Sequence, residues 1–221
     1  EIMPSLVGSE MCIRDRWYVV DSEPGSYLYC GLSRDASKEE ILERINNNTI
    51  TDILNKIEVK AGDVVMVKAG TIHAIGAGVF ICEIQQNSNC TYRMYDYDRR
   101  DKFGNPRELH VKKALDVVDN HKYIKDNKTE VVIARNEHFT EERLVQCKYF
   151  EVYKYDVNDE AKITVDEASF VSVLFINGSG TIETDDYEKT MEFKAGDSFF
   201  VSAGLRSIII KGQATMVVTR I

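Results

Sequence analysis

The histidine at position 73 follows a turn within a pattern that occurs twice in this chain. Residues 60–70 read Lys-Ala-Gly-Asp-Val-Val-Met-Val-Lys-Ala-Gly, and residues 194–204 read Lys-Ala-Gly-Asp-Ser-Phe-Phe-Val-Ser-Ala-Gly. After its second turn the first copy carries His73, whereas the second copy carries Ser207 at the same place. Histidine is the commonest metal ligand among side chains. The difference predicts that the first copy keeps a ligand-binding residue and that the second keeps only the fold.

The alternative for His73 is an ordinary core residue, because a histidine in an apolar strand is often simply packed. The glycines around it favour the ligand interpretation. Gly62 and Gly70 allow tight turns on either side of a strand. Such turns aim the following residue into the mouth of a small β-barrel.

Each copy of the repeat consists of a turn, an apolar strand and a second turn, which indicates a repeated β module. Many short strands with glycine turns, and no regular alternation of helix and strand, favour antiparallel sandwiches or barrels. We therefore predict a mainly β chain of two barrel modules, with a few helices attached to the first. The expected strands lie at residues 17–21, 27–31, within 58–99, and at 149–155, 162–165, 170–177, 180–184, 199–202, 206–210 and 214–219.

Three helices are expected in the first module. Ser37-Lys38-Glu39-Glu40 reads as a capping box that opens a helix. Residues 50–57 suggest a second, short helix, and Pro106 begins a third. The side chains expected to face inward are Ile41, Leu42 and Ile45 in the first helix and Leu109, Val111, Ala114, Leu115 and Val118 in the third.

Composition limits the partners of the chain. The 221 residues carry a net charge of −8, which argues against a general nucleic-acid or membrane surface, because either would need a basic face. An acidic protein can still hold a phosphate group locally. The five cysteines include no Cys-x-x-Cys pair. Free thiols in a reducing cytoplasm are the simplest interpretation.

The spacing that leads to His73 resembles a known metal motif. Gly62, Ala69-Gly70 and His73 are similar to the second metal motif of the cupins, which are small jelly-roll barrels, although Val67 and Ala69 lie where that motif usually has proline. The resemblance implies two cupin-type jelly-roll modules. We expect a partial metal-bearing cupin domain with helices at residues 17–118, a polar linker at 119–146 and a metal-free cupin domain at 147–221.

A longer stretch of sequence resembles one enzyme family. It comprises Gly70-Thr71-Ile72-His73-Ala74-Ile75-Gly76, Glu83-Ile84-Gln85-Gln86-Asn87-Ser88 and Thr91-Tyr92-Arg93-Met94-Tyr95-Asp96-Tyr97-Asp98-Arg99, and it continues through Glu108–Leu115. Together these segments resemble type I mannose-6-phosphate isomerases, particularly the shorter bacterial form. The resemblance covers residues 17–221.

The resemblance implies an activity and a set of roles. The family interconverts mannose 6-phosphate and fructose 6-phosphate by moving a proton between C1 and C2 through an enediol or enediolate. It uses zinc held by a glutamine, two histidines and a glutamate, and His73 matches the second histidine. Glu83 is then the candidate acid/base, Arg93 orients the sugar or stabilises charge, and Arg99 contacts the phosphate. We also expect a cytoplasmic monomer that acts on a hexose 6-phosphate, with no nucleic-acid or membrane partner.

The N-terminus departs from this pattern. No Gln-x-His-Pro segment is present, and Asp15 stands where the family glutamate would precede Trp17-Tyr18. The end of residues 1–16, Met-Cys-Ile-Arg-Asp-Arg, resembles a translated sequencing adapter. We therefore expect a non-native leader, which is set aside in predicting the fold, a chain that is a fragment, an incomplete zinc site and weak or no activity.

Two other functions remain open. A non-catalytic cupin module for sugars or a regulatory ligand would not need Glu83 and Arg93 near His73; both would then be ordinary outward side chains. An iron oxygenase would need a His-x-His segment followed by glutamate, which is absent from the sequence. The isomerase interpretation requires His73, Glu83 and Arg93 to share one cavity, with Glu83 and Arg93 expected on adjacent strands.

Overall fold

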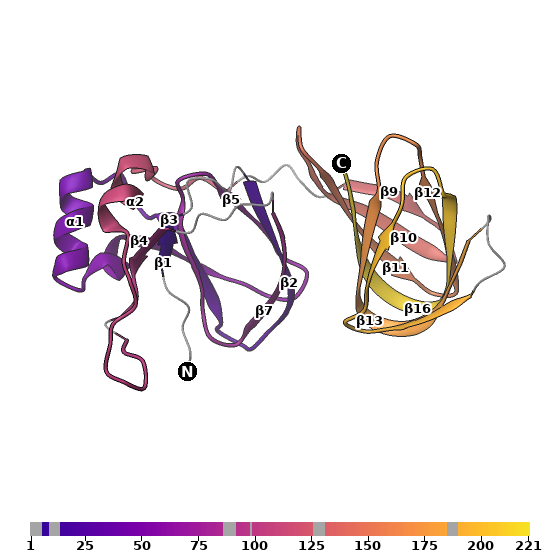
Figure 1. The fold of residues 1–221 in the computed structure, drawn as a ribbon, viewed down its shortest axis with the longest axis horizontal. Coiled ribbons are helices and arrows are strands. Elements are labelled where there is room, and N and C mark those ends of the chain that lie inside the picture. Colours follow the sequence, from indigo (N-terminus) through magenta and orange to yellow (C-terminus); the bar gives the residue numbers. More distant parts are fainter. Residues whose placement is uncertain (1–5, 9–13, 86–91, 98, 126–130, 185–189) are drawn as a thin grey trace. The chain divides into compact units, whose positions relative to one another are not determined.

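The structure of this chain, a computed structural model, describes two compact units, residues 1–126 and 127–221 (Figure 1). The described residues are 6–8, 14–85, 92–97, 99–125, 131–184 and 190–221, and for residues 6–8, 14 and 15 the description covers the backbone alone. Each unit is considered by itself.

The first unit contains two antiparallel sheets, a five-stranded sheet in the order β4-β3-β6-β1-β8 and a three-stranded sheet in the order β5-β2-β7. An apolar cluster that includes Trp17, Leu28 and Val65 draws its side chains from both sheets. The two sheets therefore enclose a core. Their strands are β1 (Leu6–Gly8), β2 (Arg14–Ser22), β3 (Tyr27–Leu32), β4 (Leu54–Glu58), β5 (Val64–Lys68), β6 (Ile72–Ile75), β7 (Val79–Gln85) and β8 (Tyr92–Tyr95).

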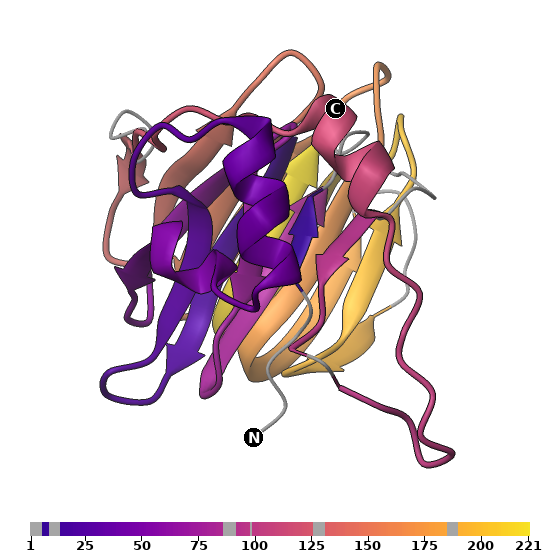
Figure 2. The ribbon, with the colours of Figure 1, turned by 90° about the vertical axis from the view of Figure 1, so that its left-hand side faces the viewer.

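Helices cover the other face of the five-stranded sheet (Figure 2). They are α1 (Lys38–Asn46), the 3₁₀ helix η1 (Ile50–Ile53) and α2 (Val111–Val117). Ile41 of α1 and Ala114 of α2 join Ile72 of β6 in one buried cluster. The predicted cap of α1 is confirmed, because the Ser37 side chain accepts a hydrogen bond from the Glu40 amide at 3.1 Å.

Three helix predictions were wrong in detail. Leu42 was expected to face inward but is 39% exposed. The helix expected from Pro106 begins at Val111, after a segment that contains the exposed Leu109. Of residues 50–57, the last four belong to β4, where Ile57 packs against the core between the sheets. For residues 54–57, pairing with β3 overrides local helix propensity.

The second unit is one curved eight-stranded antiparallel sheet. Its main order is β14-β13-β16-β11-β10-β9, with β12 paired to β16 and β15 paired to β13. Side chains such as Phe175, Ile163 and Ile210 fill a core on one face. The strands are β9 (Val131–Arg135), β10 (Phe139–Gln146), β11 (Glu151–Val157), β12 (Glu160–Val165), β13 (Val171–Thr184), β14 (Met191–Lys194), β15 (Ser198–Val201) and β16 (Arg206–Arg220).

The prediction of a mainly β chain is confirmed, but the pairings among the described residues form three sheets and no closed barrel. Part of the expected linker at 119–146 forms β9 and β10. Its polar side chains had suggested a bridge, yet an antiparallel sheet can present polar residues on its solvated face. Residues 1–16 were expected to be a non-native leader and were set aside in the prediction of the fold. Within them, β1 lies between β6 and β8, where its backbone supplies the hydrogen bonds that those strands would otherwise lack.

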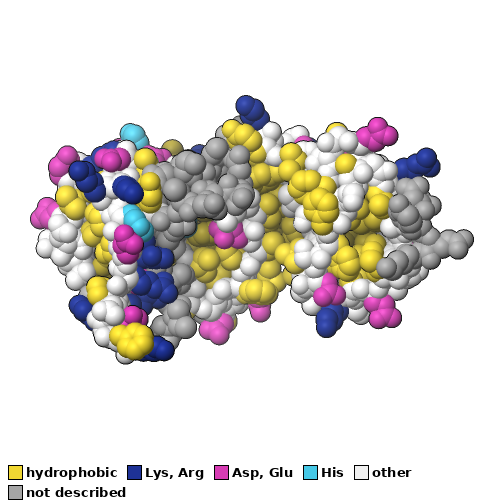
Figure 3. Space-filling model, in the orientation of Figure 1, with side chains coloured by type: hydrophobic (Ala, Val, Ile, Leu, Met, Phe, Trp, Pro, Cys, Tyr) yellow, Lys and Arg dark blue, Asp and Glu magenta, His cyan; other side chains and the backbone are white. Residues whose placement is uncertain are grey.

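The described surface carries charges of both signs. On the face drawn in Figure 3, acidic and basic side chains occur close together, so this view offers no continuous basic face. Among the described residues, no helix is long and apolar enough to cross a membrane.

Candidate active site

His73 lies on β6, buried to 8% exposure within the first unit. Its Nδ1 is 2.8 Å from the Thr71 carbonyl oxygen. A carbonyl only accepts hydrogen bonds, so Nδ1 carries the proton and Nε2 keeps its lone pair. Burial lowers the pKa of the imidazole, although the Thr71 hydrogen bond and the Glu83 charge act in the opposite direction. His73 is therefore a neutral imidazole whose orientation is fixed by a backbone carbonyl, as is usual for a metal-ligating histidine.

Trp17 lies between His73 and Glu83. Its ring meets the His73 ring edge-on, with centroids 5.3 Å apart and an interplanar angle of 74°. Its indole Nε1–H donates a hydrogen bond of 2.8 Å to Glu83 Oε1. One buried side chain thus contacts both the predicted metal ligand and the predicted acid/base.

Strand register shows which face carries the other candidates. Val7 of β1 pairs with His73 on one side and with Arg93 of β8 on the other, and Cys30 of β3 pairs with His73. Residues directly opposite each other in neighbouring strands point to the same face of a sheet. Cys30 belongs to the core between the two sheets, so His73 and Arg93 lie on the inner face. Two strand spacings separate their backbones by about 10 Å.

The three-stranded sheet presents Glu83 from the opposite side. Val65, Trp17 and Glu83 are register partners across β5, β2 and β7, and Val65 and Trp17 are core residues. The side chain of Glu83 therefore projects from the inner face of its sheet. Because β7 is an edge strand, Glu83 is also exposed to solvent.

The expectation that Glu83 and Arg93 lie on adjacent strands was wrong. β7 and β8 are edge strands of two different sheets. Their proximity in the sequence had suggested neighbouring strands, whereas β7 pairs with β2 and β8 pairs with β1. Glu83 and Arg93 nevertheless occupy the inner faces of the two sheets that enclose His73.

The segment before α2 lies along the backbone of Arg93. The His110 amide donates to the Arg93 carbonyl at 2.7 Å, and Arg93 Nη1 is 3.5 Å from the Glu108 carbonyl oxygen. The Arg93 amide lies 3.4 Å from His110 Nδ1. These contacts anchor β8 along its outer edge.

Arg99 is held by a buried carboxylate. Its Nε donates to the Asp96 carbonyl at 3.2 Å, and its Nη2 pairs with the Asp96 carboxylate. Asp96 is 4% exposed, and Arg107 Nε lies 3.9 Å from its other oxygen. The contacts recorded for Arg99 thus orient its guanidinium through Asp96.

The described residues provide only part of a metal site. No group of three or more histidine, cysteine, aspartate or glutamate side chains gathers among them. Asp15 pairs with Gln85 through its backbone, but its side chain is not described. His73 has the donor chemistry of a zinc ligand, so it fits one position of a site that needs at least three.

From the sequence, Trp17 served only to locate the position of the family glutamate and was not recognised as part of the site. Trp17 follows Asp15 by two residues in β2. The pairing with Glu83 depends on which strand lies beside β2, and periodicity carries no such information.

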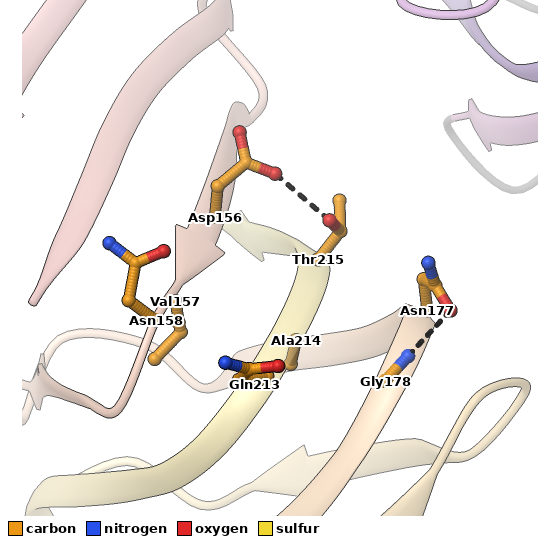
Figure 4. A pocket seen from close by; sticks show the side chains of 8 residues that line it. All are labelled: Asp156, Val157, Asn158, Asn177, Gly178, Gln213, Ala214 and Thr215. Carbon is orange, nitrogen blue, oxygen red and sulfur yellow. Dashed lines mark hydrogen bonds between the residues drawn. The ribbon is translucent and has the colours of Figure 1, made fainter.

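A separate hollow of about 460 Å³ lies within the second unit (Figure 4). Its polar side chains interact with neighbouring groups: Asp156 accepts a hydrogen bond from Thr215 at 2.9 Å and pairs with Lys154 at 2.7 Å, and Asn177 accepts from the Gly178 amide at 2.8 Å. None of the predicted site residues lines it. The lining residues are Asp156, Val157, Asn158, Asn177, Gly178, Gln213, Ala214 and Thr215.

Comparison with known proteins first defines a class. Residues 140–221 match the family described as "Mannose-6-phosphate isomerase, cupin domain". The chain also superimposes on the crystal structure of mannose 6-phosphate isomerase from Bacillus subtilis, with a TM-score of 0.88 and 32% identity, over 100% of this chain and 72% of that one. A protein from Archaeoglobus fulgidus with 19% identity and a TM-score of 0.67 shares the fold. The second unit therefore contains a cupin domain.

Two relatives from Bacillus subtilis (strain 168) agree in sequence. "Putative mannose-6-phosphate isomerase YvyI" is 40% identical over 210 residues, and "Mannose-6-phosphate isomerase ManA" is 32% identical over 215 residues. Each alignment covers 93% of this chain and 63% of the relative, so the chain spans less than two thirds of their length. The chain belongs to the mannose-6-phosphate isomerase family.

Proposed function

We propose that this chain takes part in the interconversion of mannose 6-phosphate and fructose 6-phosphate. Family membership and the enclosure of His73 by two sheets that carry Glu83 and Arg93 on their inner faces support the proposal. The observation that carries it is the chain of contacts from His73 through Trp17 to the Glu83 carboxylate. The substrate class is a hexose 6-phosphate.

Glu83 is the proposed acid/base. Trp17 donates to Oε1, so Oε2 is the oxygen available for proton transfer. In the direction from aldose to ketose, Glu83 removes the proton from C2 and returns it to C1 of the enediolate, while the O2 hydroxyl proton passes to O1. Arg93, a permanent cation on the facing sheet, stabilises the negative charge that develops on the substrate oxygens. Arg99, oriented by Asp96, is the proposed phosphate contact.

We also propose that the reaction uses zinc. When bound, zinc would polarise the substrate oxygens or hold a catalytic water. The Nδ1–H of His73 is donated to Thr71, which leaves Nε2 as the ligand atom. The described residues do not complete a set of ligands, so no catalytic step is derived through the metal. The proposed compartment is the cytoplasm, because the described cysteines Cys30, Cys82 and Cys147 are free thiols, and the proposed assembly is a monomer.

The test is direct detection of isomerisation. The chain is incubated with mannose 6-phosphate and Zn²⁺, and the formation of fructose 6-phosphate is followed by ³¹P NMR. We expect conversion that falls strongly in Arg93→Ala and is unchanged in Arg135→Ala, a control at an exposed arginine of the second unit. Conversion by the native chain no faster than in buffer, or equal losses in both variants, would contradict the proposal.

A further inference from the structure

Trp17 is the most tightly held polar aromatic residue near the candidate site. It is 1% exposed and lies on the central strand of the three-stranded sheet, between β5 and β7. Val19, Val65 and Val67 pack in the same cluster. Its indole ring therefore has one fixed position, and so does its N–H group.

The side chain of Glu83 is held less firmly than that of Trp17. It lies on an edge strand and is exposed. A carboxylate with several accessible rotamers is a poor acid/base, because proton transfer requires the oxygen at hydrogen-bonding distance from the reacting carbon. Among the described residues, the hydrogen bond to its side chain comes from Trp17, its direct register partner.

The same indole ring fixes the neighbouring imidazole. The edge-on contact with His73 is a favourable aromatic geometry, and the Thr71 carbonyl fixes the ring from the Nδ1 side. Rotation of His73 is thereby restricted from two directions. A rigid partner that contacts both groups keeps the distance between them constant.

We propose that Trp17 is a positioning residue, which holds the Glu83 carboxylate through its N–H group and the His73 ring through its face-to-edge contact, so that acid/base and ligand keep one relative geometry. The expected effect of Trp17 on catalysis rests on the proposed isomerase function. The contacts of Trp17 with Glu83 and His73 do not depend on that function. The alternative is that Trp17 only fills the core.

The hydrogen bond from Trp17 to Glu83 is tested by a measurement that does not depend on enzyme activity. The chain contains a single tryptophan, so ¹⁵N–¹H correlation spectra show one indole N–H signal. Glu83→Ala removes the acceptor, and we expect the indole proton to move upfield and to exchange faster with solvent. Glu83→Gln keeps an acceptor oxygen and keeps the signal close to its original position. Glu58→Ala, which removes an exposed carboxylate on β4, is the control and leaves the signal unchanged. An indole signal that is the same in Glu83→Ala and in the native chain would overturn the proposal.

The catalytic consequence is tested with Trp17→Phe, which keeps an aromatic ring and removes the N–H group. We expect kcat to fall by about 10- to 100-fold, as for other residues that orient catalytic groups, with KM within about twofold. The matched control is Tyr123→Phe. Tyr123 packs against the same core cluster and donates its hydroxyl to the Met66 carbonyl at 3.0 Å, away from Glu83.

The outcomes separate the two proposals. If Trp17→Phe and Tyr123→Phe lose kcat equally, Trp17 has only a packing role and the positioning proposal is wrong, while the isomerase function stands. If the native chain shows no isomerisation but the indole signal responds to Glu83→Ala, the proposed function fails and the structural coupling stands. A normal kcat in Trp17→Phe together with an altered KM also contradicts positioning, because it assigns Trp17 to substrate binding.

Discussion

At the scale of single residues, the Thr71 carbonyl determines what His73 can do. By accepting the Nδ1 proton at 2.8 Å it selects one tautomer, and burial keeps the ring neutral by lowering its pKa. A ligand nitrogen needs both conditions, since a protonated imidazole has no lone pair to donate. The local sequence Gly70-Thr71-Ile72-His73 supplies the turn, the carbonyl and the imidazole within one short segment.

Substitutions at Glu83 separate its chemistry from its structural contact. Glu83→Gln keeps an oxygen that can accept from Trp17 but cannot act as a base, so we expect kcat to fall by about 10²- to 10⁴-fold with little change in the free energy of unfolding. Glu83→Ala leaves the buried indole N–H without its acceptor and costs about 1 kcal/mol more in stability. Steady-state kinetics and urea denaturation measure the two effects. A stable, fully active Glu83→Gln variant would contradict the acid/base assignment.

At the scale of elements, β13 and β16 show how glycines allow two long paired strands to approach each other closely. A Cβ on Gly178 would lie 1.9 Å from the Gln213 carbonyl oxygen, and one on Gly180 would lie 2.0 Å from the Lys211 carbonyl oxygen. A bulge between Phe175 and Asn177 accompanies this close approach. Bulges and glycines of this kind bend strands without ending them.

Two glycines of the second unit form a matched pair for substitution. Gly178 has φ of +89° and no room for a Cβ, whereas Gly196 has φ of +90° and nothing within 4 Å. Gly196→Ala therefore carries only the cost of left-handed backbone, about 1 kcal/mol. Gly178→Ala adds overlap with a backbone atom that cannot move aside, and we expect a loss of about 3 kcal/mol or more. Thermal and urea unfolding of both variants check the difference. Equal losses would show that β13 and β16 are less closely packed at Gly178 than the structure describes.

A pH-dependent contact joins two turns of the second unit. His138 Nδ1 lies 2.9 Å from Asp159 Oδ1, and the hydrogen bond raises the pKa of His138 and lowers that of Asp159. The histidine contribution to stability is complete below the unfolded pKa of about 6.5 and is lost as pH rises through the higher folded value. The aspartate contribution is complete above about 3.9 and is lost as pH falls through the lower folded value.

The pair therefore stabilises the fold mainly between these limits. We expect His138→Gln to remove the fall of the urea midpoint that the loss of this pair causes above about pH 6.5 and below about pH 3.9. Asp119→Asn is the control, since it removes the carboxylate of the comparable exposed pair with His121 in the first unit. If the native and His138→Gln profiles are parallel, the pair does not contribute to stability.

Sequence reasoning identified elements better than it identified their neighbours. The cap at Ser37 and the apolar strand after Gly62 follow from local patterns, and both are present. The order of strands does not follow, because it depends on pairing between distant segments. Glu83 and Arg93 are thus recognisable as candidates, but their places on two facing sheets and the link through Trp17 become visible only from register. The strands expected at 170–177 and 180–184 leave Gly178 between them, whereas β13 continues through Gly178 with a positive φ.

At the scale of the whole molecule, each unit has its own apolar core. Phe175, Ile163 and Met216 belong to the core of the second unit. Trp17 and Cys30 belong to the core between the sheets of the first unit. The described clusters of the two units share no residue, and each is large enough to stabilise a separate fold. The candidate site lies within the first unit, whereas the match to the cupin domain of the family covers most of the second.

This division predicts how damage to one core affects the other. Phe175 is fully buried and stacks on Phe193 with ring centroids 3.7 Å apart, so Phe175→Ala should destabilise the second unit by about 3 to 5 kcal/mol. The single tryptophan reports only on the first unit. Because the cores are separate, we expect amide exchange of β13 and β16 to accelerate strongly while the Trp17 fluorescence transition in urea keeps its midpoint. Ile41→Ala truncates a buried side chain of the first unit. It should lower the midpoint of the Trp17 transition and leave the amide exchange of β13 and β16 unchanged. If Phe175→Ala moves the Trp17 transition as far as it moves the exchange of β13, the two units unfold as one cooperative body, and a substitution in the cupin domain then weakens the candidate site through stability alone.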